Sequence, residues 1–354
     1  MTSTRERLNE NDEIDLVELV KTLWRKKLLI TVTTIFVTAV AGAYAFLATP
    51  VYEARVFVLP PSQNDIAHLN YGRGGESGLD RLSVKDIADV YARHLQSESL
   101  RRAFFQTVFL PTVGLEERNG SQDALYGRFN RLLGVAQVGK DAPARFSVTA
   151  KLPDPQQAVQ WVTDYVQMAG NLAKSEVLKN VESEAMVKAN NLQQRIYGAQ
   201  DSARKQREDQ IVQLKEALLV ARSIGLEKPP IISYGTNRAS EFAADTEGPL
   251  TYMRGSKALE AEIENLQNRQ SDDPFIKNMR EQQAALSFYR SLKIDPVMVA
   301  VYRQDGIVEV PDRPVQPKKL IILVLGAVGG LVLGLLLAAF SHVWSKATVV
   351  RDPQ

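Results

Sequence analysis

The residues of this chain that could take part in catalysis are few and poorly placed. Gly75-Glu76-Ser77-Gly78 sets a serine between glycines, a pattern typical of nucleophilic serines, but the chain has only three histidines, His68, His94 and His342. A nucleophilic serine needs a histidine base that is oriented by an acid, and the positions of these residues indicate no such triad. A flexible loop explains the glycines better.

Cofactor and carboxylate sites have as little support. Gly72-x-Gly74 lacks the spacing of a dinucleotide fingerprint, and no G-x-x-x-x-G-K-[ST] phosphate loop occurs. Asp272-Asp273 stands before Pro274, where a helix-starting turn explains it better than paired catalytic carboxylates. The absence of cysteine excludes thiol catalysis, cysteine-based zinc sites and disulfides. We therefore predict no enzyme, no cofactor and no metal site. A net charge of +2 over 354 residues also gives no indication of a nucleic-acid partner.

Two uncharged stretches are long enough to cross a membrane, at residues 28–49 and 320–340. About 20 apolar residues span a hydrocarbon core of about 30 Å. The apolar region of a cleavable signal peptide is shorter than the first stretch and starts closer to the N-terminus, so we expect an anchor. The sequence therefore predicts transmembrane helices at 28–49 and 320–341.

Cations beside the spans predict their orientation. The basic run 25–27 precedes the first span, and short segments rich in lysine and arginine stay in the cytoplasm. Lys318 and Lys319 oppose this locally, but their stems can snorkel, and charges next to a long translocated domain count for little. Both termini are therefore predicted in the cytoplasm.

The second predicted span carries a stripe of small residues. Gly326, Gly330, Gly334 and Ala338 recur every four residues. Such a face lets another transmembrane helix approach closely. Glycine is common in membrane helices in general, but three in register favour helix packing. The partner is either a helix of another molecule or the first span of the same chain.

The longest helical pattern runs from Pro155 to about Ile224, with only Gly170 and Gly198 as weak points and no internal proline. A helix of this length measures about 105 Å. Gly225 and the prolines that follow should end it. Its first part has an apolar stripe that should pack on the strands predicted at 51–59 and 145–152. The stripe is formed by Val159, Val162, Val166, Ala169, Leu172 and Ala173.

The middle of this predicted helix has no apolar residue from Arg204 to Gln210. A helix that is polar all round cannot be buried in its own domain, so this part should project into solvent or line a neighbouring subunit. Pairs four residues apart, Arg204 with Glu208 and Lys205 with Asp209, would support it modestly.

The rest of the sequence between the two spans predicts further strands and helices, which we expect to form a base domain of mixed α and β structure. Strands are expected at 51–59, 145–152, 297–302 and 307–310, and helices at 84–108, 122–133, 256–269 and 273–292. Ser83 should cap the first of these helices.

The fold class is thus an α+β membrane protein, with two transmembrane helices flanking a periplasmic α/β base domain and a very long projecting helix. The expected domains are a cytoplasmic amphipathic segment 1–27, spans 28–49 and 320–341, a periplasmic domain 50–319 and a cytoplasmic tail 342–354. Within the periplasmic domain we expect a base at 50–153 and 293–317, the long helix at 155–225, and a distal loop with return helices at 226–292.

The order of these segments resembles the Wzz-type polysaccharide co-polymerases, the O-antigen chain-length determinants. The resemblance covers nearly the whole chain and rests on DEIDLVEL at 12–19, PVYEA at 50–54, ARSIGLEKP at 221–229, YMRGSKAL at 252–259 and the Pro314-x-x-Pro317-Lys318 approach to a glycine-rich span. Relatives with a cytoplasmic kinase have a phosphate loop and a tyrosine-rich tail. The short tail here has no tyrosine, so the resemblance is to the kinase-free class.

The resemblance implies a non-enzymatic regulator in the bacterial inner membrane. It would set the modal length of O-antigen or a related polysaccharide together with an integral-membrane polymerase, as a ring-shaped homo-oligomer. A lipid-linked polysaccharide is a further partner under this reading. The alternative is a periplasmic adaptor or structural component of an envelope export complex, although such proteins usually have one anchor and modules of many short strands.

Overall fold

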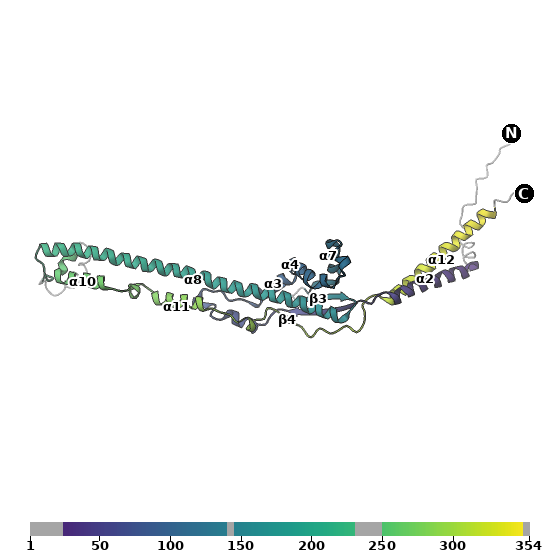
Figure 1. Cartoon of the computed structure of the whole chain (residues 1–354), viewed down its shortest axis with the longest axis horizontal. Coiled ribbons are helices and arrows are strands. Elements are labelled where there is room, and N and C mark those ends of the chain that lie inside the picture. Colours follow the sequence, from purple (N-terminus) through teal and green to yellow (C-terminus); the bar gives the residue numbers. More distant parts are fainter. Residues whose placement is uncertain (1–23, 140–144, 231–249, 350–354) are drawn as a thin grey trace, which may run out of the picture. The chain divides into compact units, whose positions relative to one another are not determined.

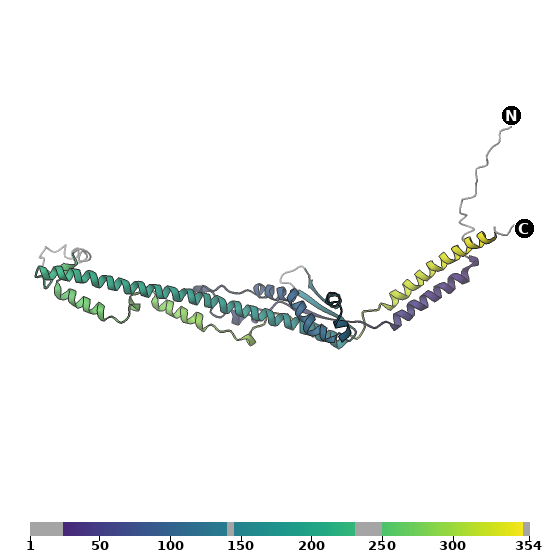
Figure 2. The same ribbon diagram turned by 45° about the horizontal axis from the view of Figure 1, so that its top comes forward.

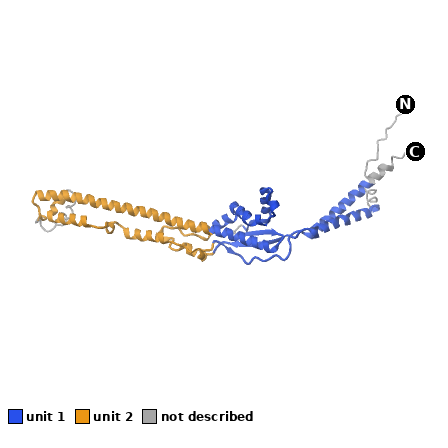
Figure 3. Cartoon of the chain, viewed as in Figure 1, with its two compact units in different colours: residues 1–61, 87–173, 301–354 blue, residues 62–86, 174–300 orange. Residues whose placement is uncertain are grey.

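The computed structural model describes residues 24–139, 145–230 and 250–349, with side chains up to residue 341 (Figures 1 and 2). The chain forms two compact units (Figure 3). Unit 1 comprises residues 1–61, 87–173 and 301–354, and unit 2 comprises residues 62–86 and 174–300. One helix, α8 (Pro155–Ser223, 69 residues), contributes to both units. The predicted unbroken long helix is confirmed.

A four-stranded antiparallel sheet in the order β2-β3-β1-β4 forms the centre of unit 1. Its strands are β1 (Tyr52–Leu59), β2 (Leu133–Val138), β3 (Arg145–Leu152) and β4 (Arg303–Gln304). The period of two brings Val56 opposite Val148 and Ala54 opposite Ala150, and these residues are buried on one face. The strands predicted at 51–59 and 145–152 are confirmed, whereas β2 was missed.

The short helices between Ser83 and β2 surround an aromatic core in unit 1. They are α3 (Val84–Leu95), α4 (Glu98–Phe104), the π-helix η3 (Phe105–Phe109), α5 (Leu110–Thr112), α6 (Leu115–Arg118) and α7 (Gln122–Leu132). The single helix predicted at 84–108 was wrong, because Ser97 ends one helix and caps the next by accepting a hydrogen bond from Leu100 N. Ser83 does cap α3, accepting from Asp86 N at 3.2 Å.

The first part of α8 buries most of the predicted stripe, including Ala173, and adds two aromatic side chains to it. Figures 1 and 2 both draw it beside the strands. Val162, Val166 and Ala169 are buried as predicted, but Leu172 is 43% exposed. Trp161 and Tyr165 take the central positions, since their rings reach the phenyl rings of α4, η3 and α7.

Unit 2 consists of a helical hairpin and the glycine-rich loop within residues 62–86. The return elements are η4 (Thr251–Arg254), α10 (Ser256–Asn268), η5 (Asp273–Phe275), α11 (Met279–Ser291) and η6 (Pro296–Met298). Helix α10 packs on α8 around Leu214 and Ala221, and α11 packs around Leu192 and Ile196. The expectation of one helix at 273–292 was wrong, because Asn278 adopts a left-handed conformation and separates η5 from α11.

Helix α8 ends as its sequence predicts. Gly225 has a φ of +71°, its N–H donates to Arg222 O, and Leu226 N donates to Ala221 O. These two bonds make a Schellman motif, which satisfies carbonyls at the end of the helix. The polar segment that follows, at 233–248, lies outside the described residues.

Two strands predicted shortly before the second span were wrong. Residues 297–302 and 307–310 form no strand, and between residues 297 and 310 only Arg303–Gln304 pairs with β1. Val299 and Val301 are nevertheless buried, so their alternation reflects anchoring of an extended segment. Strand-like alternation needs a neighbouring backbone to become a sheet.

The glycine-rich loop is ordered, contrary to the flexible loop predicted from its glycines. It contains η1 (Ala67–Asn70) and η2 (Gly75–Ser77). The Asn70 amide bonds both the N–H and the carbonyl of Leu82 at 2.8 Å. The buried Arg73 donates to Asp80 O and pairs with Glu184 of α8. The loop is therefore a strap fastened to the long helix.

Candidate functional site

The predicted small-residue face lies against the first span of the same chain. Helices α2 (Lys27–Leu47) and α12 (Lys319–Val349) are packed together, and α2 and residues 319–341 of α12 are long and apolar enough to cross a membrane. A Cβ atom added at Gly330 would lie 2.9 Å from Thr34 Cα, and one at Gly326 would lie 2.6 Å from Ala41 Cβ. Only a residue without a side chain allows this separation of the two backbones.

The same contact continues toward the ends of both helices. A Cβ at Gly334 would stand 3.0 Å from Ile30 Cα, and Ala338 is fully buried. Lys26 Nζ donates to Ser341 Oγ. The hydroxyl of Thr34 donates to Ile30 O at 2.8 Å, so the α2 surface satisfies its polar groups within its own helix. The observed partner is one of the two that the sequence left open.

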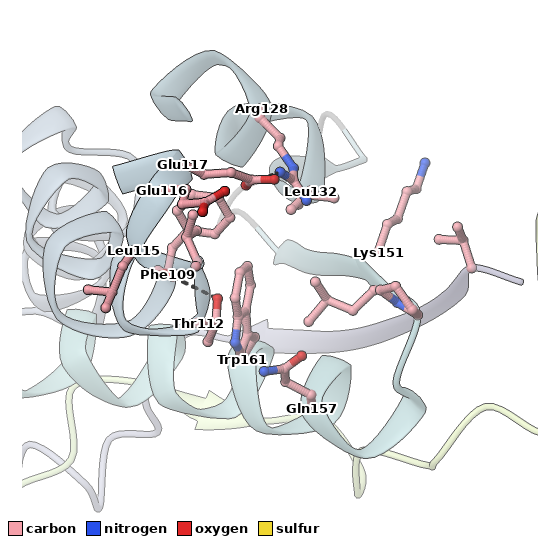
Figure 4. A pocket seen from close by; sticks show the side chains of 15 residues that line it. Phe109, Thr112, Leu115, Glu116, Glu117, Arg128, Leu132, Lys151, Gln157 and Trp161 are labelled. Atoms are coloured by element: carbon pink, nitrogen blue, oxygen red, sulfur yellow. Dashed lines mark hydrogen bonds and ion pairs between the residues drawn. The ribbon is translucent and has the colours of Figure 1, made fainter. Parts of the chain in front are cut away.

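A hollow of about 790 Å³ in unit 1 is the second candidate site (Figure 4). Its wall includes the buried rings of Phe109 and Trp161 and the side chain of Leu132. The volume falls within the range of about 300–1,000 Å³ for small-molecule sites. No sequence prediction pointed here, because its lining residues come from separated segments, 51, 109–117, 128–132 and 151–161.

The polar groups around this hollow are nearly balanced in charge. Glu116, Glu117, Arg128 and Lys151 line it, and in the view of Figure 4 the first three lie together above Trp161, with Lys151 farther to the right. Arg128 pairs with Glu117 at 3.0 Å, and Lys151 pairs with Glu53 at 3.7 Å. Both cations are thus occupied by carboxylates of the chain itself.

The wall of the hollow is positioned by an unusual helix. The π-helix η3 follows α4 and ends at Phe109, whose ring stacks on Phe105 and meets Trp161 edge-on. Tyr165, which follows Trp161 by one turn of α8, donates a hydrogen bond to Leu95 O at 3.0 Å. Burial raises the pKa of Tyr165 to about 12. π-Helical turns are rare and often mark functional sites.

The polar middle of α8 faces the chain's own return segment in part. Arg207 donates to Arg269 O at 2.8 Å and lies 3.6 Å from Asp272, and the side chains of Arg207 and Asp272 are mostly covered. The other residues from Arg204 to Gln210 are exposed as predicted, so the expectation of an exposed stretch was wrong only for Arg207. The Arg204–Glu208 pair forms at 3.4 Å, whereas Lys205 pairs with Asp201 instead of Asp209.

The catalytic candidates have structural roles where the structure describes them. Ser77 Oγ donates to Gly74 O, within the strap. Asp273 accepts from the Gln200 and Gln283 amides, bonds that lower its pKa, with that of Gln200 the stronger. Within residues 24–139, 145–230 and 250–349, no group of three or more histidine or carboxylate side chains could hold a metal ion.

Most of the known proteins that this chain resembles are named as chain length determinants. The family described as "Wzz: Chain length determinant protein" matches residues 12–108. A chain length determinant protein of Escherichia coli K12 is 26% identical over 333 residues, covering 92% of this chain and 93% of the relative. The family match begins at residue 12, and its first residues, which include segment 12–19, precede the part of the chain that the structure describes.

Solved structures show the same fold. A full-length bacterial polysaccharide co-polymerase has a TM-score of 0.69 at 23% identity, covering 94% of this chain and 99% of that structure. The wild-type lipopolysaccharide O-antigen chain-length regulator of Shigella flexneri has a TM-score of 0.52 at 18% identity, covering 74% of this chain and 99% of that structure. The resemblance to Wzz-type co-polymerases and the α+β fold class are confirmed, and the chain is a two-span inner-membrane protein.

Proposed function

We propose that this chain, a relative of the chain length determinants along nine-tenths of its length, is a non-enzymatic regulator of polysaccharide chain length. The observation that carries the proposal is the near-complete coverage of both chains, since the alignment leaves less than a tenth of either chain outside it. The polymer is O-antigen or a related polysaccharide, and the regulator needs no cofactor.

The proposed topology follows from the basic residues beside α2. Arg25, Lys26 and Lys27 hold the N-terminus in the cytoplasm, and two spans return the C-terminus to the same side. Residues 50–319 are then periplasmic, with the domain limits expected from the sequence. Reporter fusions within residues 60–310 should report the periplasm, and a periplasmic C-terminus would contradict the two-span topology.

A homo-oligomeric ring is part of the proposal. Large apolar side chains of α8 that the described chain leaves exposed support it, among them Val187, Val212 and Leu219. Leu219 is 70% exposed and has two further exposed apolar residues near it in the sequence, Val220 and Ile224, and exposed apolar groups that lie together favour contact with another copy. Electron microscopy of detergent-extracted particles tests this directly, because a monomer would contradict a ring.

The proposed partner in the membrane is an integral-membrane polymerase. The glycine face of α12 is used by α2, which leaves the outer faces of the hairpin for the polymerase. Those faces include Phe36 and Val40 of α2 and Val324 and Leu331 of α12, all about half exposed or more. A lipid-linked polysaccharide is the natural third component beside them.

Deletion and complementation test the proposed function. Cells without the protein should still make polysaccharide, with its preferred length lost or shifted on a gel that separates polymers by size. Purified protein that hydrolysed or transferred sugars alone would contradict the non-enzymatic part. An envelope export adaptor, the alternative, would instead change export with chain lengths unaltered.

A further inference from the structure

The hollow of unit 1 lies at the membrane surface because of its covalent connections. Val51, which lines it, follows Leu47 of α2 after three residues, 48–50. A chain spans at most about 3.6 Å per residue, so Val51 lies within about 15 Å of the end of the span. Val51 N also donates to Gln316 O, shortly before α12 begins at Lys319. Both spans therefore leave the membrane beside this hollow.

We propose that this hollow binds one sugar unit of a polysaccharide at the membrane surface, with a face of the ring on the apolar wall. The proposal rests on the proposed function, which supplies a polysaccharide next to the membrane. A sugar ring offers apolar C–H faces and a rim of hydroxyl groups that both donate and accept hydrogen bonds. The site needs the matching combination of apolar wall and acceptors of hydrogen bonds.

The lining provides this combination. The apolar side consists of the exposed Leu115 and the half-buried Leu132, together with the buried rings of Phe109 and Trp161. The polar side offers the Glu116 carboxylate and the Gln157 amide. A carboxylate accepts from two adjacent hydroxyls, and an amide donates and accepts. Thr112 Oγ1 donates its proton to Phe109 O at 2.7 Å, so toward the hollow it serves as an acceptor.

Charge balance favours a neutral sugar over a phosphate. A phosphate site needs cations that are free to form bonds with the anion. Here Arg128 and Lys151 are already paired with Glu117 and Glu53, and Glu116 adds a negative charge. A lipid headgroup phosphate would therefore be repelled at the side where Glu116 stands, whereas hydroxyl groups would be bound there.

Binding can be followed through a single natural fluorophore. The chain has three tryptophans, Trp24, Trp161 and Trp344, and among the side chains that the structure describes the hollow is lined by Trp161 alone of these. Full-length protein with Trp24→Phe and Trp344→Phe, in lipid nanodiscs, would be titrated with host polysaccharide released from its carrier by mild acid. A saturable change in Trp161 emission is expected with the polysaccharide, and none with inorganic phosphate or with dextran at equal mass.

Gly114 allows the hollow to be filled without disturbing the fold. Gly114 lines the hollow, and its φ of −60° is one that any residue can adopt. A Cβ added there would meet nothing within 4 Å. Gly114→Tyr should therefore weaken polysaccharide binding at least tenfold while leaving the far-ultraviolet circular dichroism and particle size unchanged. Gly198→Tyr, at an equally open glycine of α8 outside the hollow, is the matched control and should bind like the parent.

Glu116→Gln tests the polar side and should weaken binding about fivefold through loss of charge-assisted hydrogen bonds. Glu216→Gln, on the exposed surface of α8, should have no effect. Absence of a saturable response, a response to phosphate alone, or undiminished binding by Gly114→Tyr would each overturn the sugar site. The proposed function fails separately, when deletion of the gene leaves polysaccharide lengths unchanged.

Discussion

The two parts of α8 are stabilised in different ways. Residues 155–173 belong to unit 1, where large rings such as those of Tyr165 and Phe104 are fully buried in one aromatic cluster. Residues 174–223 belong to unit 2, where two small aliphatic clusters flank a polar stretch held by hydrogen bonds. The first part can hold its shape by its own core, whereas the second depends on fewer apolar contacts and leaves large apolar side chains exposed.

Two leucines of equal burial give the largest test of this difference. Leu100 in unit 1 and Leu259 in unit 2 are both 0% exposed. We expect Leu100→Ala to lower the free energy of unfolding by about 4–5 kcal/mol and Leu259→Ala by about 2–3 kcal/mol, because a small cluster can close around the cavity. Denaturant unfolding of unit 1 is monitored by Trp161 emission, and that of unit 2 by hydrogen exchange in α10.

Equal losses in the two variants would contradict the comparison. A larger loss for Leu259→Ala would reverse it, and would mean that the return helices are held by their apolar clusters more tightly than the aromatic core holds the base.

The membrane hairpin extends the comparison to a contact between backbones. Gly330→Leu places a branched side chain where Thr34 Cα would be 2.9 Å from its Cβ, so α2 and α12 must separate. Contacts between membrane helices are worth about 1–2 kcal/mol each, and leucine is well solvated by lipid. We therefore expect normal expression and oligomer size, with polysaccharide lengths shifted on a gel.

Leu331→Ala serves as the control, since Leu331 is half exposed and lies off the glycine face. Unaltered polysaccharide lengths in the Gly330→Leu strain would mean that the close contact of the two spans has no role in length control.

Substitutions in the polar stretch of unit 2 should change stability less than the leucine substitutions do. Asp272→Asn removes the charge that Arg207 and Arg269 share, and the Asp272 side chain is only 10% exposed. We expect a loss of about 1–2 kcal/mol, measured as faster hydrogen exchange at residues 269–275. Glu208→Gln, in an exposed pair, should change stability by no more than about 0.5 kcal/mol. Equal rates of hydrogen exchange in the two variants would show that the Arg207–Asp272 pair does not stabilise the return segment.

The smallest effects concern pH and have opposite signs in the two units. Hydrogen bonds from Gln200 and Gln283 lower the pKa of Asp273 in unit 2, so their stabilisation is present above about pH 4 and is lost as pH falls below it. Burial raises the pKa of Tyr165 to about 12 in unit 1, so stabilisation is lost as pH rises above about 10.

Asp273→Asn should therefore flatten the acid side of the stability curve of unit 2 by less than about 1 kcal/mol, because the group is largely solvated. Tyr165→Phe should flatten the alkaline side of unit 1. Acid unfolding that is identical with and without Asp273 would remove this part of the comparison.

Much of the fold could be predicted because it depends on neighbours in the sequence. The bounds of β3, the length of α8 and its end at Gly225 follow from alternation, absence of proline and the left-handed preference of glycine. The errors occurred where a local pattern allowed two outcomes. Ser97 could lie inside a helix or cap one, and Val299 could belong to a strand or an isolated extended segment.

The candidate sites depended on contacts between distant segments. The sequence showed that Gly326, Gly330 and Gly334 form a face, yet both possible partners offered the same chemistry, and only the fold brought Thr34 against it. The hollow beside Trp161 could not be predicted, since residues from β3, α6 and α7 line it together. Its signal in the sequence, the phenylalanines around the π-helix, indicated a core and gave no location for an opening.

The sequence by itself determined the two apolar spans, the unbroken length of α8 and the family resemblance. These properties come from composition and from periods of a few residues, which act through local propensity and transfer to lipid. Tertiary structure alone decided that the rings of Trp161 and Tyr165 join the buried face of α8, that Arg207 meets the return segment, that α2 covers the glycines, and where the hollow opens. Each of these is a choice between surfaces of similar local character, and it is made by the packing of segments far apart along the chain.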